Sequence, residues 1–404
     1  MVPVTKMPTR NVPRPRGIRT AGQLDRAAGV LLGAAAGDAL GVPYEFQPPL
    51  AEGERPQMIG GGLGPYEPAE YSDDTQMAVC IAQVAASGND LRAEHVLDAI
   101  AVNFLDWAER GATDIGAQTS AVLSAARANK SVGPAAALRA AAADLRQRTG
   151  RTAGNGSLMR TAVVALPYLD DPEAMAQAAR AVSDLTHPDP LAGDACVLWC
   201  AAVRRAVLDG TFGGPREGLA LLPGGHRDRW AAWIAEAEAC EPATFAPNGF
   251  VVPALQAAWS AVSQAYVLIQ GAFGGAAGRE HIDLSLAAAI RAGDDTDTVA
   301  AIAGALLGAR WGAGVLLSSG LAPRVHGWPG TRACCGARRS GGRCSTAGLA
   351  GHARAWRCCR PGTGTAGRAG SPKPKHASRA PSHRTASSSP RCKQHGRRCH
   401  RRTF

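Results

Sequence analysis

Aromatic residues are scarce in this chain of 404 residues: Phe, Trp and Tyr together make up 5% of it. Few stretches alternate β-branched with polar residues, whereas alanine-rich stretches with apolar residues at helical spacing run through most of the sequence. Alanine has the highest helix propensity of all residues. The composition therefore argues against a β-rich fold and favours close-packed helices.

Long hydrophobic runs are also lacking. No apolar run reaches about 18 residues, the length that predicts a transmembrane helix, because charged residues interrupt the alanine-rich stretches. The N-terminal segment MVPVTKMPTRNVPRPRGIRT is basic and rich in proline, without the apolar core of a secretory signal. We therefore expect a cytoplasmic protein without a membrane partner.

Acidic residues are missing from residues 331–404, which hold 18 Lys and Arg. Residues 1–330 carry the other 26 basic residues and all 33 acidic ones, so the net charge of +11 conceals a body with a charge of −7. Seven of the eleven cysteines also lie after residue 330, without the paired C-x₂-C spacing of a zinc site. Such a segment cannot build a core, so we expect a disordered basic tail.

Two interpretations of this tail remain open. The favoured one is a shifted reading frame in a GC-rich gene, which would produce a segment of this composition, and the nucleotide sequence after Gly330 would test it. The other is a tail that binds RNA or DNA through its charge. The expected organisation is a disordered arm at 1–20, one domain at 21–330 and the tail at 331–404.

The body shows helical spacing in eleven segments, which predict a single all-α domain. No fixed-period repeat is present, so an orthogonal multi-helix bundle is favoured over a solenoid. In the segment 190–208, Cys196 and Cys200 are one helical turn apart and are predicted core residues. The segments are 23–41, 75–87, 91–109, 116–128, 134–147, 172–184, 190–208, 228–240, 250–270, 281–292 and 298–312.

Two acidic clusters lie far apart in the sequence, in YSDDTQM at 71–77 and in AGDDTDTVA at 292–300. Each precedes a helical segment, where free backbone N–H groups and the helix dipole favour negative charge. An ordinary helix cap would account for either cluster alone, but one carboxylate suffices for a cap. If the clusters meet, their carboxylates repel one another unless a cation lies between them. Oxygen ligands without imidazole or thiolate favour Mg²⁺ or Mn²⁺.

Five motifs connect these clusters to a known family: GAAAGDALGVPYE, YSDDTQM, TAGNGSLMR, DLTHPDP and AGDDTDTVAAIAGALLGARWG, in that order. Over residues 25–330 the chain resembles the ADP-ribosylglycohydrolase family. The resemblance implies an all-α bundle with two Mg²⁺ or Mn²⁺ ions at the base of an ADP-ribose cleft. It also implies an enzyme that hydrolyses the bond at C1″ of the distal ribose and releases ADP-ribose from a modified protein or other acceptor.

The resemblance assigns the metal ligands within the two acidic clusters. Relatives often carry Thr where Ser72 stands, and Ser keeps the hydroxyl ligand. At Asp294 a neutral residue is commoner, and we expect Asp294 to cap the following helix. Asp38 is expected to orient a water near the ions or to stabilise its turn. The implied ligands are Ser72, Asp73, Asp74, Asp295, Asp297 and Thr298.

The implied catalytic residues lie in the loop before the first cluster, in that cluster and after it, and the implied substrate residues lie between the two clusters. Glu45 lies in the long loop at 43–71, which has the length and composition of a binding loop. Together with Asp74 and Asp114 it forms the expected catalytic set, with Glu45 or Asp114 handling the proton. Without the resemblance, Glu45 could equally be an exposed loop carboxylate, and Asp114 would belong to an ordinary turn. The implied substrate residues are Gly154, Asn155, Gly156, Ser157, Met159 and His187.

Backbone N–H groups beside glycines at a helix start suit a diphosphate, although a GNG sequence by itself usually marks a turn.

Two other functions remain open at this point. One is a catalytically silent ADP-ribose-binding protein on the same fold. The other is a metal-dependent phosphohydrolase, which would not account for the TAGNGSLMR and THPDP segments.

Overall fold

The computed structural model of the chain describes residues 17, 19–51, 53–269 and 274–324. These residues belong to one of two units, Met1–Ala333. The predictions for residues 1–16 of the N-terminal arm and for the basic tail at 331–404 lie outside the described residues. Inside them, Thr20 caps the first helix by accepting from Gln23 N, and Arg19 pairs with Asp170.

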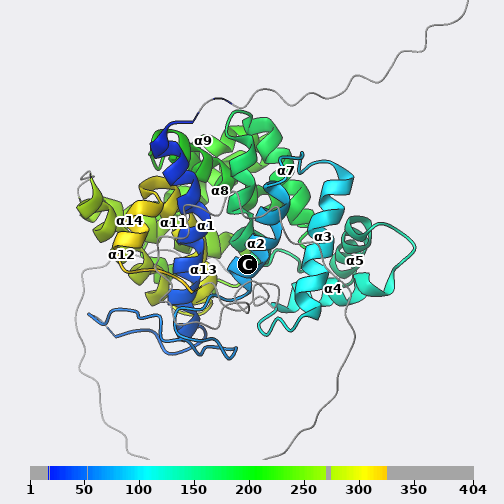
Figure 1. Cartoon of the computed structure of the whole chain (residues 1–404), viewed down its shortest axis with the longest axis horizontal. Coiled ribbons are helices and arrows are strands. Elements are labelled where there is room, and N and C mark those ends of the chain that lie inside the picture. The colour runs from blue at the N-terminus through cyan, green and yellow to red at the C-terminus, as the bar shows by residue number, and fades with distance from the viewer. Residues whose placement is uncertain (1–16, 18, 52, 270–273, 325–404) are drawn as a thin grey trace, which may run out of the picture. The chain divides into compact units, whose positions relative to one another are not determined.

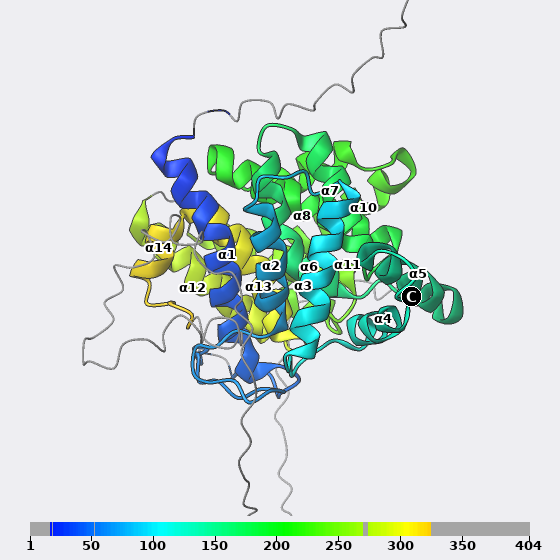
Figure 2. The ribbon, with the colours of Figure 1, turned by 45° about the vertical axis from the view of Figure 1, so that its right-hand side comes forward.

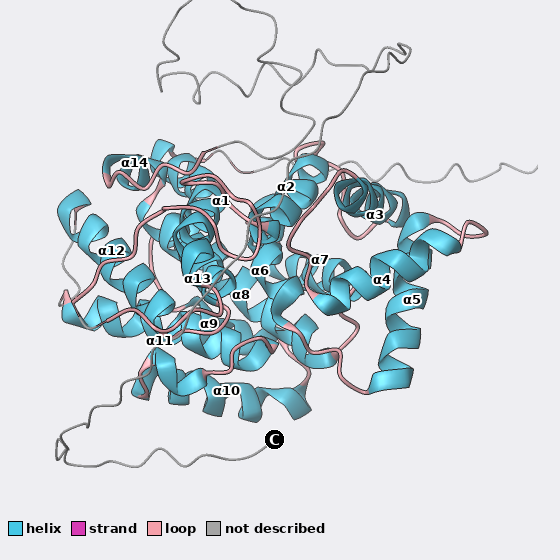
Figure 3. Ribbon diagram, turned by 90° about the horizontal axis from the view of Figure 1, so that it is seen from below, coloured by secondary structure: helices cyan, strands magenta, loops and turns pink. Residues whose placement is uncertain are grey.

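The described part of the chain is all-α, as predicted (Figure 3). Its extended backbone pairs only at three isolated bridges. The helices form an orthogonal bundle, joined by loops and short 3₁₀ turns. They are α1 (Ala21–Gly41), α2 (Asp73–Ala85), α3 (Glu94–Glu109), α4 (Ala117–Ala128), α5 (Pro134–Thr149), α6 (Leu158–Thr161), α7 (Pro172–Asp184), α8 (Pro190–Asp209), α9 (Gly214–Gly218), α10 (Gly224–Ala239), α11 (Val251–Leu268), α12 (Gly275–Arg291), α13 (Thr296–Trp311) and α14 (Ala313–Ser318).

Each of the eleven predicted segments coincides with one of the long helices, with ends that differ by a few residues. Helical spacing indicated none of α6, α9 and α14 among the described helices, although the glycine segment predicted a helix start at Ser157, one residue before α6. These three have four, five and six residues. A helix of one or two turns presents too few apolar positions to show a period of 3.6 residues.

Helices α1 and α13 lie side by side in the middle of the bundle (Figures 1 and 2). Glycines allow their backbones to touch, because a Cβ atom on Gly33 would lie 2.1 Å from the carbonyl oxygen of Gly304. At the end of the same seam, a Cβ on Gly41 would lie 2.4 Å from the Cα of Asp297. The antiparallel packing thus places the start of α13 against the end of α1.

By length and composition, the segment Ala21–Tyr44 is the one described segment that could cross a membrane. However, 67% of its apolar window is buried inside the structure. Its glycine-lined contact with α13 accounts for that burial. The apolar character of α1 is therefore that of a core helix.

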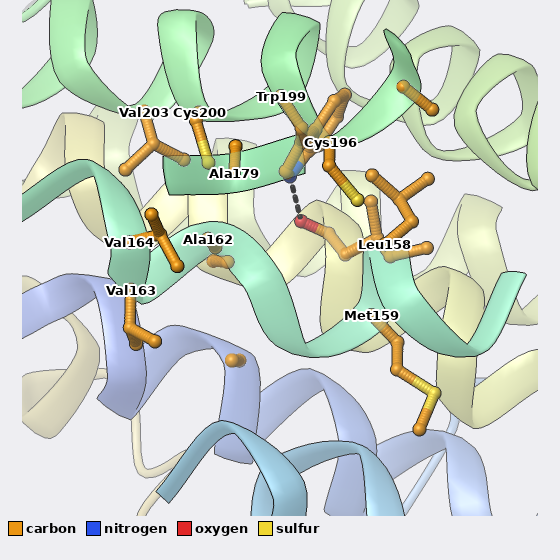
Figure 4. Close-up of a cluster of buried hydrophobic side chains, with 14 of the residues drawn as sticks. Leu158, Met159, Ala162, Val163, Val164, Ala179, Cys196, Trp199, Cys200 and Val203 are labelled. Atoms are coloured by element: carbon orange, nitrogen blue, oxygen red, sulfur yellow. Dashed lines mark hydrogen bonds between the residues drawn. The ribbon is translucent and has the colours of Figure 1, made fainter. Parts of the chain in front are cut away.

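A dense apolar core joins α6, the 3₁₀ segment Ala162–Tyr168, α7 and α8 (Figure 4). Cys196 and Cys200 are fully buried free thiols in this core, as predicted. The indole of Trp199 in α8 donates a hydrogen bond of 3.1 Å to the carbonyl oxygen of Ile302 in α13. This contact ties α8 to α13, which begins at the second acidic cluster.

Candidate metal centre and cleft

The two acidic clusters meet where the N-termini of α2 and α13 reach the C-terminal end of α1. The hydroxyl oxygen of Ser72 lies 3.2 Å from Oδ2 of Asp297, although the two residues are 225 positions apart. It also lies 3.0 Å from Oδ2 of Asp74. The two acidic clusters, far apart in the sequence, therefore come together in the fold.

Asp38 on α1 holds the start of α2 in place. This fully buried carboxylate accepts hydrogen bonds from Ser72 N and Ser72 Oγ, both at 2.8 Å, and from Thr75 N at 3.0 Å. Ser72, the N-cap residue of α2, makes no capping bond with its own side chain. Asp38 therefore caps α2 from another helix, and its carboxylate lies directly beside the clusters.

The buried oxygen atoms of this cluster outnumber the hydrogen atoms that the neighbouring groups can donate to them. Ser72 has one hydroxyl hydrogen but faces carboxylate oxygens of Asp38, Asp74 and Asp297. The other oxygen of Asp74, Oδ1, is buried without a hydrogen-bond partner among the described residues. Buried polar atoms without partners are costly and rare in folded proteins. A cation bound by these oxygens would remove the deficit.

The pKa values show the same deficit of positive charge. Burial, reinforced by the neighbouring carboxylates, raises the pKa of Asp73, Asp74 and Asp297 well above the usual range. Burial also raises the pKa of Asp38 to about 6, against the hydrogen bonds from Ser72 and Thr75 that lower it. Carboxylates crowded in this way ionise together only when positive charge compensates them.

The carboxylates form two groups that share one member. Oxygens of Asp38, Asp74 and Asp297 lie within 4.8 Å of one another, and so do oxygens of Glu45, Asp114 and Asp297. Oxygen-only donor sets of this kind suit hard divalent ions. The shared carboxylate of Asp297 can contribute one oxygen to each group. The residues present thus fit a divalent cation, and their arrangement offers two adjacent positions.

A cleft of about 560 Å³ opens from this centre. Its acidic end is formed by Glu45, Asp73, Asp114, Asp295, Asp297 and Thr298. Its other end, the glycine end, is formed by Gln118, Thr119, Arg151, Gly154, Asn155, Gly156, Met159, His187 and Phe250, among others. Of the predicted site residues, Ser72 and Asp74 lie buried beneath the acidic end. All the others except Ser157 line the cleft.

Ser157 is the predicted substrate residue that does not line the cleft. Its hydroxyl accepts a hydrogen bond from Ser183 Oγ at 3.0 Å and lies 3.6 Å from the thiol of Cys196. Both partners belong to the core helices α7 and α8. The 3₁₀ turn Asn155–Ser157 directs the side chain of Asn155 to the cleft and that of Ser157 to the core. The sequence GNGS does not predict which side chain faces which way.

The amide of Asn155 joins the glycine segment to the second acidic cluster. Its Nδ2 donates to Asp295 Oδ2 at 2.7 Å and to the carbonyl oxygen of Asn248 at 3.1 Å. Asn248 in turn accepts from Asp295 N at 3.0 Å and donates to the carbonyl oxygen of Gly293 at 3.0 Å. Sequence reasoning missed the fully buried Asn248, whose only local signal is the Asn-Gly pair of a turn.

Asp294 does not cap α13 as the sequence predicted. The N-cap residue is Asp295, and Asp294 has a positive φ of 64°. Its carboxylate accepts from Asn248 N at 2.7 Å. The left-handed backbone turns Asp294 away from the helix axis, so it fastens the neighbouring loop instead. Asp294 and Asn248 therefore hold the Asp295 end of the site together.

The fold and this site together define an all-α protein with a cluster of carboxylates, able to fit a divalent cation, at one end of a cleft. The family model described as ADP-ribosylglycohydrolase matches residues 19–331, and the chain belongs to the ADP-ribosylglycohydrolase family. The resemblance found in the sequence motifs is confirmed over nearly the same residues.

Two relatives share this body at moderate identity. The chain is 29% identical over 299 residues to an ADP-ribosylarginine hydrolase Tri1 of Pseudomonas putida (strain GB-1), covering 72% of this chain and 71% of the relative. It is 27% identical over 297 residues to an ADP-ribosyl-dinitrogen reductase glycohydrolase of Rhodospirillum rubrum, covering 71% and 86%. A solved structure of an ADP-ribosylglycohydrolase-related protein complex is similar with a TM-score of 0.52 at 27% identity, covering 74% of this chain and 91% of that one.

Proposed function

We propose that this protein is a hydrolase that releases ADP-ribose from an ADP-ribosylated acceptor by cleaving the bond at C1″ of the distal ribose. The observation that carries the proposal is the meeting of two distant acidic clusters at one end of a cleft of about 560 Å³. Family membership and the names of both relatives support hydrolysis of an ADP-ribosylated substrate. Glycosidic cleavage between carboxylates at such a site is chemically reasonable.

The metal dependence is also part of the proposal. The residues that would hold Mg²⁺ or Mn²⁺ are Ser72, Asp73, Asp74, Asp295, Asp297 and Thr298. Asp38 would keep Ser72 in position by accepting its two hydrogen bonds. When bound, such ions supply Lewis-acid polarisation of hydroxyl groups and a lowered pKa of water. The uncompensated carboxylates described above support this assignment.

The glycine end of the cleft suits the diphosphate and distal ribose. Gly154 and Gly156 carry no side chains between the cleft and the imidazole of His187. Backbone N–H groups beside glycines can approach phosphate oxygens closely. A substrate seated there would place its reacting sugar carbon toward the acidic end.

The reaction needs one water and the transfer of one proton. Water adds to C1″, the bond from C1″ to the acceptor atom breaks, and the acceptor departs with the bonding electrons and takes up a proton. Burial, followed by the charges of Asp114 and Asp295, raises the pKa of Glu45 to about 9. Burial also raises the pKa of Asp114, and its hydrogen bond with Glu45 offsets part of that rise. The two carboxyls can thus share a proton, which places one as acid and the other as base.

The test compares metal binding with ADP-ribose release. The full chain is stripped with chelator, titrated with Mn²⁺ by calorimetry, and incubated with peptides or nucleic acid that carry ADP-ribose on arginine, serine or a terminal phosphate. Asp73→Ala and Asp297→Ala should weaken Mn²⁺ binding and abolish release. Asp209→Asn removes a carboxylate that is 44% exposed at the far end of α8 and should change neither.

Several results would contradict the proposal. Full activity of either cluster variant, or of the chelated wild type, would remove the metal mechanism. Tight binding of ADP-ribose without turnover of any ADP-ribosylated acceptor would identify a catalytically silent ADP-ribose-binding protein instead. Release of inorganic phosphate would identify a phosphohydrolase.

A further inference from the structure

Arg160, in the one-turn helix α6, is a buried cation that the proposed chemistry does not use. Its side chain is fully buried, and no carboxylate of the described residues forms an ion pair with it. Its guanidinium carbon lies 4.6 Å from the ring centre of Phe104, and NH1 lies 3.4 Å from Met77 Sδ. Burying a charge without a partner of opposite sign is costly, so a specific role has to offset this cost.

The remaining polar contact of Arg160 leads to the cleft. NH2 donates a hydrogen bond of 2.6 Å to the hydroxyl oxygen of Thr186. The same oxygen lies 2.7 Å from Nδ1 of His187. Thr186 is fully buried, and its backbone oxygen accepts from Gln118 Nε2 at 2.9 Å. The chain of contacts from Arg160 to the imidazole is therefore held at each link.

The direction of these hydrogen bonds follows from the groups involved. A guanidinium has only donors, so the Thr186 oxygen must accept from Arg160. The Thr186 hydrogen then needs an acceptor, and among the described residues Nδ1 of His187 is the one within reach. Nδ1 can accept only if it carries no proton, which places the proton of the neutral ring on Nε2.

We propose that Arg160, acting through Thr186, holds His187 in the tautomer with its proton on Nε2, so that this N–H donates to a phosphate or ribose oxygen in the cleft. The inference rests on the proposed function, because it takes the ligand to be an ADP-ribosyl group. Arg160 and Thr186 are positioning residues, and His187 makes the contact.

The surroundings of Nε2 support a donor at this place. A Cβ atom on Gly156 would lie 3.2 Å from Nε2, and one on Gly154 would lie 3.4 Å from it. The lack of side chains on Gly154 and Gly156 leaves room beside the ring nitrogen, and His187 lines the cleft although only 1% of it is exposed. The opposite tautomer would turn a lone pair toward an anionic ligand in a cleft that already carries five carboxylates, Glu45, Asp73, Asp114, Asp295 and Asp297.

The nearby guanidinium also keeps the ring from taking a second proton. Burial first, and then the charge of Arg160, lower the pKa of His187 well below its usual value. Burial lowers the pKa of Arg160 only to about 10, so the arginine remains charged at neutral pH. His187 therefore offers a neutral hydrogen-bond donor at neutral pH.

The tautomer can be observed directly in the full chain labelled with ¹⁵N-histidine. Long-range proton–nitrogen couplings distinguish Nδ1 from Nε2, and His187→Asn identifies the signals of this ring. We expect the Nε2–H form in the wild type and in Thr186→Ser, which keeps the hydroxyl. Thr186→Val, which removes it, should give a mixture of tautomers. The matched control is Thr161→Val, which deletes another buried hydroxyl that does not touch His187.

Binding and kinetics supply the second measurement. Thr186→Val should raise the Kd for ADP-ribose and the KM for an ADP-ribosylated peptide about tenfold, the loss expected for one well-aligned hydrogen bond to a charged group, with a smaller effect on kcat. Thr186→Ser and Thr161→Val should stay within about twofold of the wild type, by the same relation.

The proposal is overturned if wild-type His187 carries its proton on Nδ1 or is doubly protonated at pH 7. It is also overturned if Thr186→Val keeps the single tautomer and the wild-type Kd. If the wild type neither binds ADP-ribose nor releases it from any acceptor, the proposed function fails, and the tautomer measurement alone still decides whether Arg160 and Thr186 set the protonation of His187.

Discussion

The close contact between α1 and α13 should control both the stability of the bundle and the affinity of the acidic centre for cations. Gly304→Ala tests this link, because its Cβ would lie 2.1 Å from the carbonyl oxygen of Gly33, whereas an ordinary contact begins near 3.4 Å. The two helices would have to separate locally by roughly 1 Å. Asp297 lies two turns earlier on α13, so part of this displacement would reach the acidic centre.

The expected magnitude follows from two opposing effects. Forcing a methyl group against the backbone of a packed helix costs about 3 kcal/mol, the upper end for overpacking, because a backbone carbonyl cannot rotate away as a side chain can. The higher helix propensity of alanine offsets about 1 kcal/mol of this. We therefore expect Gly304→Ala to lower the free energy of unfolding by about 2 kcal/mol and to weaken Mn²⁺ binding.

Urea unfolding and calorimetric titration with Mn²⁺ measure the two effects. The matched control is Gly225→Ala in α10, where a Cβ atom would meet nothing within 4 Å. This control should be neutral or stabilising by up to about 1 kcal/mol, with unchanged Mn²⁺ affinity. If Gly304→Ala is as stable as Gly225→Ala and binds Mn²⁺ equally well, the glycine contact does not position the centre.

Two further predictions concern buried polar residues. Asn248→Ala should lower the free energy of unfolding by about 1–3 kcal/mol, because it leaves the Asp295 N–H and the Gly293 carbonyl without partners. It should also slow ADP-ribose release. The control is Asn89→Ala at an exposed position, and equal stability and rates of the two variants would refute the argument. Burial lowers the pKa of His281 from 6.5 to about 4 in the folded protein. Between these two pH values the unfolded chain binds a proton that the folded protein does not. The free energy of unfolding should therefore fall by about 3 kcal/mol as the pH falls from 6.5 to 4. Urea unfolding of wild type and His281→Gln from pH 7 to pH 4 should show this loss as a narrowing difference, and parallel curves would contradict it.

The helices of this protein could be predicted from sequence because their causes are local. The spacing of apolar residues and the abundance of alanine gave each long helix, while α6, α9 and α14 were too short to show a period. The acidic clusters could also be recognised, because adjacent carboxylates such as Asp73 and Asp74 exceed what a helix cap requires.

The parts of the site that sequence reasoning missed depend on which side of a turn faces the cleft. Ser157 follows Gly156 directly, yet its hydroxyl lies in the core beside Ser183. Asp294 stands in the acidic cluster, yet it fastens Asn248 instead of capping α13. Neither direction follows from residue type, because both depend on backbone angles that the surrounding helices impose.

The sequence by itself determined the all-α class and the long helices, because propensity and periodicity depend only on residue types and their spacing. It also showed that the acidic clusters would need positive charge if they met. Only the tertiary structure decided that α1 and α13 touch through glycine, that Ser72 meets Asp297, and that Arg160 reaches His187 through Thr186. These contacts join residues from different helices, and their distances are set by how the helices pack against one another.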